Sequence, residues 1–331
     1  MQRYLLSLAL ISMASAANAS CGSAFCSVNT HWDTQGLSSS EGLRLDLRYS
    51  YARANQLRAG ASRLSPEAPG NSGAEIEDRR TVNQLLNIDA DYAINGRWNI
   101  ALGIPLVRRD HSHTFDPLVG DAFPQQAKFT ELGDLRIVGK YKLAAGGMEA
   151  GSGLRCGLKL PSGAINKTMS PPDPADPGQP YALERSSQPG SGSTDAILGA
   201  YYFRNYPERD WGWFVSAQFQ SPLAIRDHYR PGSEVALDLG LHYALGPSWN
   251  ALLQLNGQYR GRDTGRNANV ASGGYAWYLS PGLSYALSMQ TEIYGVWQMA
   301  VRQYVNTDPA EAGSGQLTAP WSLALGISQR F

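Results

Sequence analysis

The sequence has 331 residues, and its 28 Lys and Arg balance its 28 Asp and Glu, so the formal net charge is zero. Mean hydropathy is −0.31. Balanced charge without a basic cluster excludes the usual electrostatic basis of nucleic-acid binding. After the N-terminus there is no apolar run of the about 20 residues that a transmembrane helix needs, which excludes an α-helical membrane protein.

The N-terminal residues have the features of a secretory signal peptide. A short positive start is followed by an apolar stretch that is too short to span a bilayer, and Ala17-Asn18-Ala19 is a small-x-small cleavage site. We therefore expect residues 1–19 to be removed. A lipoprotein signal ending at Cys21 is the alternative, but Asn18 stands where such signals usually carry an apolar residue.

Residues 20–41 carry no strand pattern and are predicted to form a periplasmic segment. Cys21 and Cys26 are close in sequence, and an exported protein favours a local disulfide between them. A metal or redox site that also uses His31 is the alternative interpretation. Cys156 lies far away, in a predicted strand.

From Gly42 onward the sequence alternates between apolar and polar residues. Leu43, Leu45 and Leu47 alternate with Arg44, Asp46 and Arg48, which in a strand places the two sets on opposite faces. A helix would spread both sets around all sides, so the pattern favours strands. Twelve such segments follow in chain order: 43–52, 81–94, 98–106, 134–143, 154–160, 194–203, 211–220, 234–243, 249–258, 275–287, 291–302 and 317–331.

Short and long connections alternate between these segments. Short ones lie near 95–96, 144–147, 205–209, 246–248 and 288–290, and long ones at 58–79, 108–131, 161–192, 222–233, 261–273 and 303–316. This alternation predicts an all-β fold, a transmembrane up-and-down antiparallel β-barrel of about twelve strands over residues 42–331. Short turns are expected in the periplasm together with both termini, and long loops outside the cell.

Aromatic residues indicate which face of the barrel meets lipid. Tyr92, Trp98, Tyr243 and Trp249 flank short turns on the apolar face, the arrangement of an interfacial aromatic girdle. The polar face must then line the lumen, because charges that face mid-bilayer are costly. The predicted lumen-lining residues are Arg44, Asp46, Arg48, Asp89, Asp91, Asp134, Arg136, Lys140, Lys142, Arg155, Lys159, Glu234, Asp238, Glu292 and Arg302. Internal ion pairs that fill a narrow barrel, or a polar conduit, would both explain this set.

Three motifs carry a family resemblance. They are Leu132-Gly133-Asp134 with the following Lys140-Tyr141, the strand end Leu158-Lys159-Leu160-Pro161-Ser162-Gly163, and the Gly-rich lead Gly190-Ser191-Gly192-Ser193-Thr194-Asp195. In this order they resemble the outer-membrane transporter family of the phenol meta-cleavage (MetA) degradation pathway. The resemblance covers about residues 40–331 and implies uptake of small, often aromatic compounds.

The sequence thus predicts an outer-membrane channel or transporter for passive or facilitated uptake of small molecules, including aromatic or hydrophobic ones. The alternative is a closed barrel that serves as a surface receptor, adhesin or scaffold, with a cysteine segment that binds a metal or a redox partner. No enzyme motif, cofactor or metal site is predicted. Asp110-His111-Ser112-His113 is interpreted as part of a solvated loop, and a metal-binding His-x-His pair is the alternative interpretation.

The expected partners are outer-membrane lipid, a small-molecule substrate and the barrel assembly machinery. Phe331 is the last residue of the sequence and shares the apolar face of its strand with Leu325 and Ile327. An aromatic residue in this position resembles the signal that the assembly machinery recognises, so Phe331 is predicted to be an assembly signal.

Overall fold

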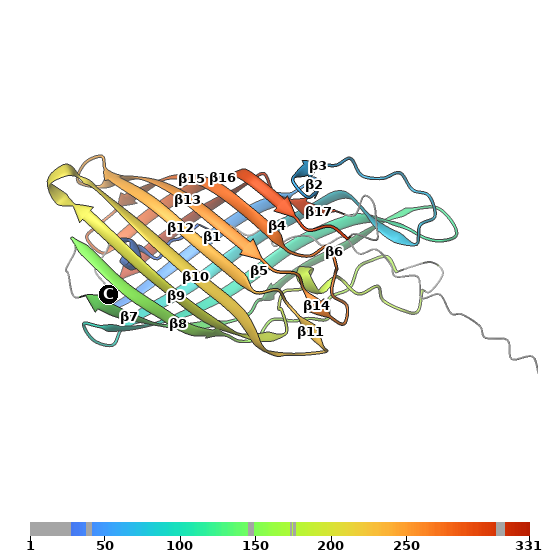
Figure 1. The fold of residues 1–331 in the computed structure, drawn as a ribbon, viewed down its shortest axis with the longest axis horizontal. Helices are drawn as coiled ribbons and strands as arrows, with labels where there is room; N and C mark the ends of the chain where they lie inside the picture. The colour runs from blue at the N-terminus through green and yellow to red at the C-terminus, as the bar shows by residue number, and fades with distance from the viewer. Residues whose placement is uncertain (1–27, 38–41, 145–148, 173, 175–176, 309–314) are drawn as a thin grey trace, which may run out of the picture.

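The computed structural model describes residues 28–37, 42–144, 149–172, 174, 177–308 and 315–331. Twelve strands form a closed antiparallel barrel, in which each strand pairs with its chain neighbour and the β4–β5 pairing completes the ring (Figure 1). The barrel strands are β1 (Leu43–Ala54), β4 (Ala74–Ala93), β5 (Trp98–Asp116), β7 (Arg136–Ala144), β8 (Ala150–Lys159), β9 (Ser193–Tyr206), β10 (Trp211–Ile225), β12 (Glu234–Ala244), β13 (Trp249–Arg260), β15 (Gly274–Ala286), β16 (Thr291–Val305) and β18 (Trp321–Arg330). The prediction of twelve strands is confirmed.

Shorter elements lie at the two ends of the barrel and inside it. They are the strands β2 (Gln56–Ala59), β3 (Ser62–Arg63), β6 (Phe123–Leu132), β11 (Tyr229–Arg230), β14 (Thr264–Gly265) and β17 (Gln316–Thr318), and the 3-10 helices η1 (Trp32–Gln35), η2 (Arg185–Ser187) and η3 (Pro207–Arg209). Within the described residues, no helix is long and apolar enough to cross a membrane.

The first and last barrel strands, β1 and β18, pair with each other. Leu45 lies opposite Gln329, and Leu47 lies opposite Ile327. The N–H of Phe331 donates a hydrogen bond to the carbonyl oxygen of Leu43 at 2.9 Å, which extends the ladder by one residue. The closed ring leaves neither strand with an unpaired edge in lipid, as a membrane-spanning sheet requires.

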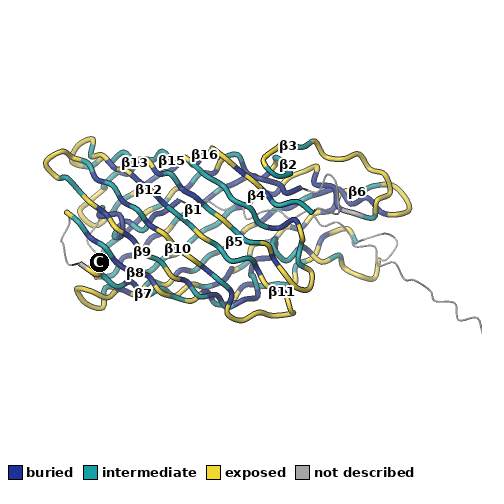
Figure 2. Tube along the Cα trace, in the orientation of Figure 1, coloured by how far each residue is buried: buried dark blue, intermediate teal, exposed yellow. Residues whose placement is uncertain are grey.

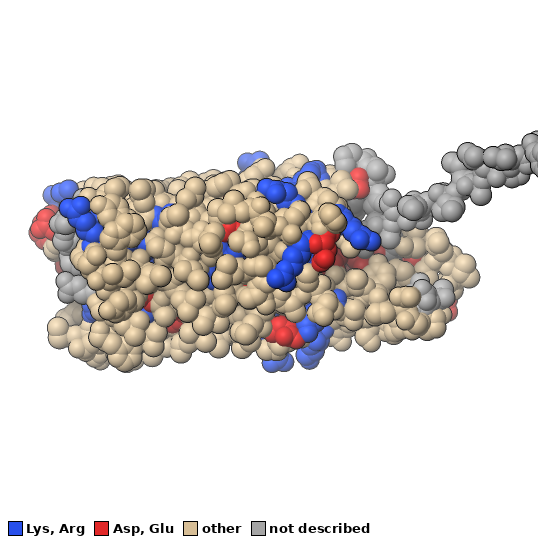
Figure 3. Space-filling view, turned by 90° about the horizontal axis from the view of Figure 1, so that it is seen from below, with Lys and Arg blue, Asp and Glu red and all other residues tan. Residues whose placement is uncertain are grey.

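The outward face of the barrel is apolar along most of its length. Leu47 is 43% exposed, Leu241 49% and Leu325 48%, and buried and exposed residues alternate along the strands (Figure 2). On the visible face, few charged side chains lie between the left end and a belt of charged residues right of the middle (Figure 3). The apolar band is the surface that a bilayer would cover.

Aromatic pairs lie on this outer face at both ends of the band. At the short-turn end the ring centroids of Trp98 and Tyr141 are 4.8 Å apart, and those of Trp249 and Tyr285 4.7 Å apart. At the long-loop end Tyr275 stacks on Tyr304 at 5.2 Å. Pairs across neighbouring strands hold these rings where an amphipathic side chain meets the bilayer surface.

One predicted loop is a strand hairpin instead. Residues 108–131 were expected to be irregular, but β5 continues to Asp116 and β6 returns along it, pairing His111 with Ala127. We use the name extension for three strand portions together: β4 from Ala74 to Thr81, β5 from Val107 to Asp116, and all of β6. Figure 1 shows the extension projecting beyond the other strands. Its outward residues, including Arg108, are polar, and its inward face mixes His111 and His113 with Phe115 and Ala127, so the apolar alternation that reveals a membrane strand is absent.

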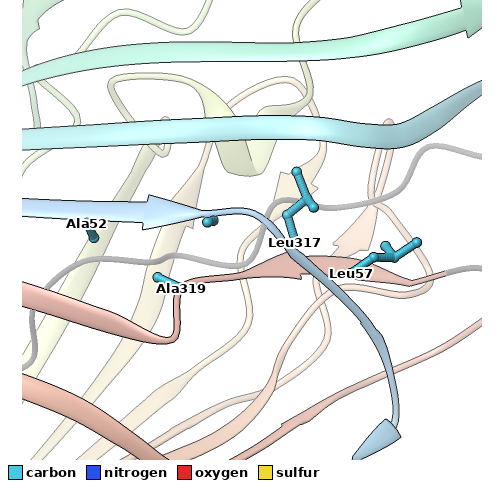
Figure 4. Close-up of a cluster of buried hydrophobic side chains, with 5 residues drawn as sticks. Ala52, Leu57, Leu317 and Ala319 are labelled. Carbon is cyan, nitrogen blue, oxygen red and sulfur yellow. The ribbon is translucent and has the colours of Figure 1, made fainter. Parts of the chain in front are cut away.

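A small apolar cluster fixes the loops at the long-loop rim. Ala52, Ala54, Leu57, Leu317 and Ala319 are all buried against one another, and Figure 4 shows four of them converging from β1, β2 and the β17 region. The cluster joins the loop after β1 to the loop before β18, so the β1–β18 seam is also closed above the membrane band.

Candidate functional site

A segment that precedes the first strand lies inside the barrel. Residues 28–37, which we call the luminal segment, include η1, and Trp32, Thr34 and Gln35 are almost completely buried. The segment runs from the middle of the lumen toward the short-turn end, where Asn205 of β9 donates a hydrogen bond to the Gly36 carbonyl at 2.9 Å. Residues 20–41 were predicted to form a periplasmic segment; of these, residues 28–37 lie inside the barrel, and the others lie outside the described residues.

Polar contacts with the barrel wall hold the first residues of the luminal segment, Asn29 and Thr30. Asn29 exchanges two backbone hydrogen bonds with the Gln254 amide, at 3.2 and 2.9 Å, and its own side-chain amide donates to Asp238 at 3.1 Å. Arg48 donates to the Thr30 hydroxyl at 2.5 Å. The polar face of the strands thus supplies the partners that the buried backbone of the segment requires.

The strongest charged contact of the luminal segment is made by Asp33. Its carboxylate accepts hydrogen bonds from the Lys140 ammonium at 3.0 and 3.2 Å, and Lys140 also pairs with Asp91 of β4. The Arg44 guanidinium lies 3.8 Å from a carboxylate oxygen of Asp33. Burial alone would raise the pKa of Asp33, but Lys140 and then Arg44 outweigh it and hold that pKa well below its ordinary value.

An aromatic contact anchors the segment on the opposite wall. The Trp32 ring packs edge-on against Tyr294, with centroids 4.9 Å apart, and both rings contact Leu252. Gly36 then ends η1 at φ +74°, and a Cβ there would lie 2.4 Å from the Phe203 ring. Only glycine combines this left-handed backbone with so close an approach.

The three motifs that carry the family resemblance meet at one point inside the barrel. Asp134 accepts hydrogen bonds from Lys159 at 3.0 Å, from the Ser191 N–H at 2.9 Å and from the Gly163 N–H at 3.1 Å. Lys159 also pairs with Asp195 at 3.1 Å. We call this group the motif junction. It ties the loop 161–192 back into the lumen, since both ends of that loop contact Asp134.

Two glycines of the motif junction are there because two backbones touch. A Cβ on Gly163 would lie 2.6 Å from the Gly190 Cα, and a Cβ on Gly190 would lie 2.4 Å from the Gly163 carbonyl oxygen. Any side chain at either position would push the ends of the long loop apart and withdraw them from Asp134. The sequence spacing alone does not show this contact.

A cavity of about 430 Å³ lies between the luminal segment and the loop 161–192. Among the described residues its walls contain eight Lys or Arg against five Asp or Glu: Arg48, Arg109, Arg136, Lys140, Arg155, Lys159, Arg185 and Arg260 against Asp89, Asp134, Asp195, Glu234 and Asp238. Among the residues that the structure describes, neither Arg136 nor Arg155 forms an ion pair. The cavity is therefore polar, with an excess of positive charge.

The structure places the predicted lumen-lining residues as follows. Nine of them line the cavity: Arg48, Asp89, Asp134, Arg136, Lys140, Arg155, Lys159, Glu234 and Asp238. Arg44 and Asp91 contact the luminal segment or its Lys140 partner, and Asp46 accepts a hydrogen bond from the Tyr294 hydroxyl at 2.8 Å. Lys142 and Glu292 lie near the short-turn end, at the inward positions of β7 and β16.

Arg302 is the exception, because it faces outward. A bulge in the β15–β16 pairing makes Trp277 the partner of Arg302 but Tyr278 the partner of Ala300, so one residue of β16 is skipped. Arg302 therefore shares the outer face with Tyr304, and its guanidinium lies 5.9 Å from the Tyr275 ring centroid. A bulge inserts one residue into the strand, so every side chain after it points to the opposite face of the sheet. The alternation in the sequence does not reveal this bulge.

Sequence reasoning also missed residues of the site. Asp33, Trp32 and Asn29 belong to a segment without periodicity, and nothing in the sequence links them to Lys140 or Gln254. Arg260 was missed although it continues the polar alternation of its strand; that alternation was a usable signal. Cys21 and Cys26, with the predicted signal peptide, lie outside the described residues.

Comparison with known proteins shows the fold alone. No family model matches the sequence, and no curated protein does. Among solved structures, the COG4313 outer membrane channel from Pseudomonas putida F1 is 12% identical, with 92% of this chain and 100% of that chain covered and a TM-score of 0.63. The CymD monoaromatic hydrocarbon channel is 10% identical with a TM-score of 0.45, covering 93% and 94% of the two chains. The P. putida toluene transporter TodX is 9% identical with a TM-score of 0.45, covering 89% and 91%.

Proposed function

We propose that the protein is an outer-membrane channel for passive uptake of small molecules, and that the luminal segment restricts passage through it. The observation that supports this most directly is a charged cavity inside a closed barrel whose outer face is apolar. A barrel of this size lies between small barrels filled by side chains and large open porins, so a ten-residue segment is enough to control its lumen.

The cavity favours polar solutes, and anions over cations. Arg136 and Arg155 add positive charge that carboxylates do not neutralise within ion-pair distance, and rings of cationic side chains select for anions in pores. The family resemblance implied aromatic or hydrophobic compounds. A wholly apolar solute would have to displace water from these charged groups without replacing their hydrogen bonds, so small organic anions fit the lining better.

Single-channel recording in planar bilayers tests this proposal. We expect discrete conductance steps and, in a salt gradient, a reversal potential that indicates anion preference. Arg136→Gln should reduce that preference, whereas Arg302→Gln, on the outer face, should leave it unchanged. Liposome swelling with an organic acid and an uncharged sugar of similar size gives a second measure, with faster entry expected for the acid.

A closed barrel that serves as a receptor or scaffold is the second candidate, and the well-anchored luminal segment favours it. It predicts no conductance from the folded protein even when the Asp33–Lys140 contact is removed. A heat-modifiable, folded barrel that never conducts and never supports swelling, in the wild type and in Asp33→Asn, would contradict the channel proposal. Cation preference in the wild type would contradict its selectivity.

A further inference from the structure

Three potential metal ligands meet inside the extension, away from the cavity. Glu77 of β4 and His111 and His113 of β5 are buried, with 4%, 1% and 1% of their surface exposed. One ligating atom from each lies within 4.8 Å of the other two. His111 and His113 are two residues apart on one strand, so both rings point to the same face.

Hydrogen bonds determine which ring nitrogens have lone pairs in this cluster. The Gln125 amide nitrogen donates to the Pro171 carbonyl at 2.8 Å, so its oxygen faces His113 Nε2 at 3.0 Å and accepts from it. His113 Nδ1 therefore carries a lone pair, which faces His111 Nε2 at 3.1 Å. The Thr81 hydroxyl lies 2.8 Å from His111 Nδ1, on the far side of that ring.

The separation of the two facing nitrogens fits a shared metal ion. Two ligands of a tetrahedral site with bonds of about 2.0–2.1 Å are about 3.3 Å apart, close to the 3.1 Å observed. Binding requires the His111 proton to move from Nε2 to Nδ1, where the Thr81 oxygen accepts it, and the two rings to turn so that both lone pairs point at the ion. Thr81 and Gln125 then orient the two rings from outside, as partners of metal-bound histidines usually do.

A second carboxylate offers a fourth ligand. Glu75 Oε2 lies 3.8 Å from His113 Nδ1, its side chain is 2% exposed, and this oxygen has no hydrogen-bond partner among the described residues. An unpartnered buried carboxylate oxygen is costly. A cation bound between Glu75, Glu77 and the two imidazoles would remove that cost.

We propose that Glu77, His111 and His113, with Glu75 beside them, form a binding site for a divalent transition-metal ion such as Zn²⁺. Two imidazoles and one or two carboxylates suit zinc and its neighbours rather than Ca²⁺ or Mg²⁺, which prefer all-oxygen sites. The ion would link β4 to β5, and through Gln125 it would steady β6 and residue 171 of the long loop. The site therefore braces the extension and takes no part in the lumen.

Zinc binding to the folded full-length mature protein in detergent tests this site. We expect one Zn²⁺ per chain by isothermal titration calorimetry. Glu77→Gln should weaken affinity at least about tenfold, and the double variant His111→Gln/His113→Gln should abolish binding. His228→Asn is the matched control: His228 is an exposed loop histidine at φ +58°, a conformation that asparagine tolerates, so binding should be unchanged.

The cysteines near the N-terminus are the competing ligands. Binding should persist in Cys21→Ser/Cys26→Ser, and its loss there would assign the metal to the cysteines and overturn the proposal. Absence of zinc binding by the wild type, or its persistence in the double histidine variant, would overturn it too. Co²⁺ absorption of the wild type gives a measure that does not depend on how the histidine variants fold: a thiolate charge-transfer band contradicts the site, and ligand-field bands without a thiolate band support it.

Discussion

The Lys140 ammonium on the barrel wall lies 3.0 Å from one carboxylate oxygen of Asp33 and 3.2 Å from the other. Asp33 belongs to the luminal segment, which the barrel encloses. Asp91 holds Lys140 from the far side. Both side chains of the Asp33–Lys140 pair are almost fully buried, with 6% and 4% exposed. The contact is thus the main charged attachment of the luminal segment to the wall.

Asp33→Asn should loosen the luminal segment and raise single-channel conductance. Removing one partner of a buried ion pair costs about 3–5 kcal/mol, because the other charge is left buried and unpaired; here Asp91 retains part of the interaction with Lys140, so the lower end of that range is expected. Recording in planar bilayers measures the change. Asp227→Asn, which alters a rim carboxylate that is 64% exposed, serves as the control. Equal conductance in wild type and Asp33→Asn would show that the segment does not restrict passage.

The Asp33–Lys140 contact should tolerate mild acid. The groups that face Asp33 are Lys140, Arg44, His31, Arg155, Tyr201 and, through Lys140, Asp91. The folded-state pKa of Asp33 lies below its ordinary 3.8. The stability that the Asp33 carboxylate gives to the attachment of the luminal segment is therefore fully present above pH 3.8, and it is lost only as the pH falls through that lower pKa. Burial, and then Lys140, keep the pKa of His31 well below 6.5, so His31 stays neutral.

Conductance between pH 7 and pH 4.5 measures this tolerance. We expect wild-type conductance to stay constant over this interval, and Asp33→Asn to conduct more at both pH values. A rise in wild-type conductance near pH 6 would mean that another group controls the segment.

Asp134→Ala should release the loop 161–192 without unfolding the barrel. The change removes the hydrogen bonds from Lys159, Ser191 and Gly163 at once, a loss on the order of 3 kcal/mol. Limited proteolysis should therefore cleave the loop faster, while the heat-modifiable mobility of the barrel is retained. Glu131→Gln, which disrupts a more exposed pair with Lys167, should change cleavage little, since such pairs contribute about 1 kcal/mol or less.

Deleting Phe331 should impair assembly more than stability. Its side chain is 72% exposed, so little packing is lost, and β18 keeps its pairing with β1 and β16 up to Arg330 and Gln329. We expect less folded barrel in the outer membrane, yet an unchanged thermal midpoint for the fraction that folds. Phe331→Tyr keeps an aromatic residue and should assemble normally. Wild-type levels of the deletion variant would remove the proposed role in assembly.

The alternation of apolar and polar residues predicted most of the barrel correctly, because lipid imposes it. Every second residue of a membrane strand must be apolar, and Leu43, Leu45 and Leu47 show this period directly. The same rule explains the failure at the extension: beyond the bilayer, Arg108 and Asp110 face water, while the inward face mixes His111 and His113 with apolar residues such as Phe115. Polar and apolar residues do not alternate there, so β5 and β6 resembled a loop.

Local sequence also cannot show contacts between distant segments. Asp33 of the luminal segment pairs with Lys140 of β7, and Gly163 and Gly190 touch although 26 other residues separate them in the sequence. The motif junction was visible only as three separate motifs. Arg302 shows the remaining limit, since a single bulge reversed its direction without changing the pattern that predicted it.

The pairing of β1 with β18 has a consequence for the order of events in folding. The luminal segment comes immediately before β1 in the chain, and it lies inside the ring that β1 completes. An empty ring that sealed first would have to be threaded afterwards by a segment carrying Trp32 and the charged Asp33. If β1 pairs with β18 around the segment, that step is avoided. The barrel then closes with the luminal segment already inside it.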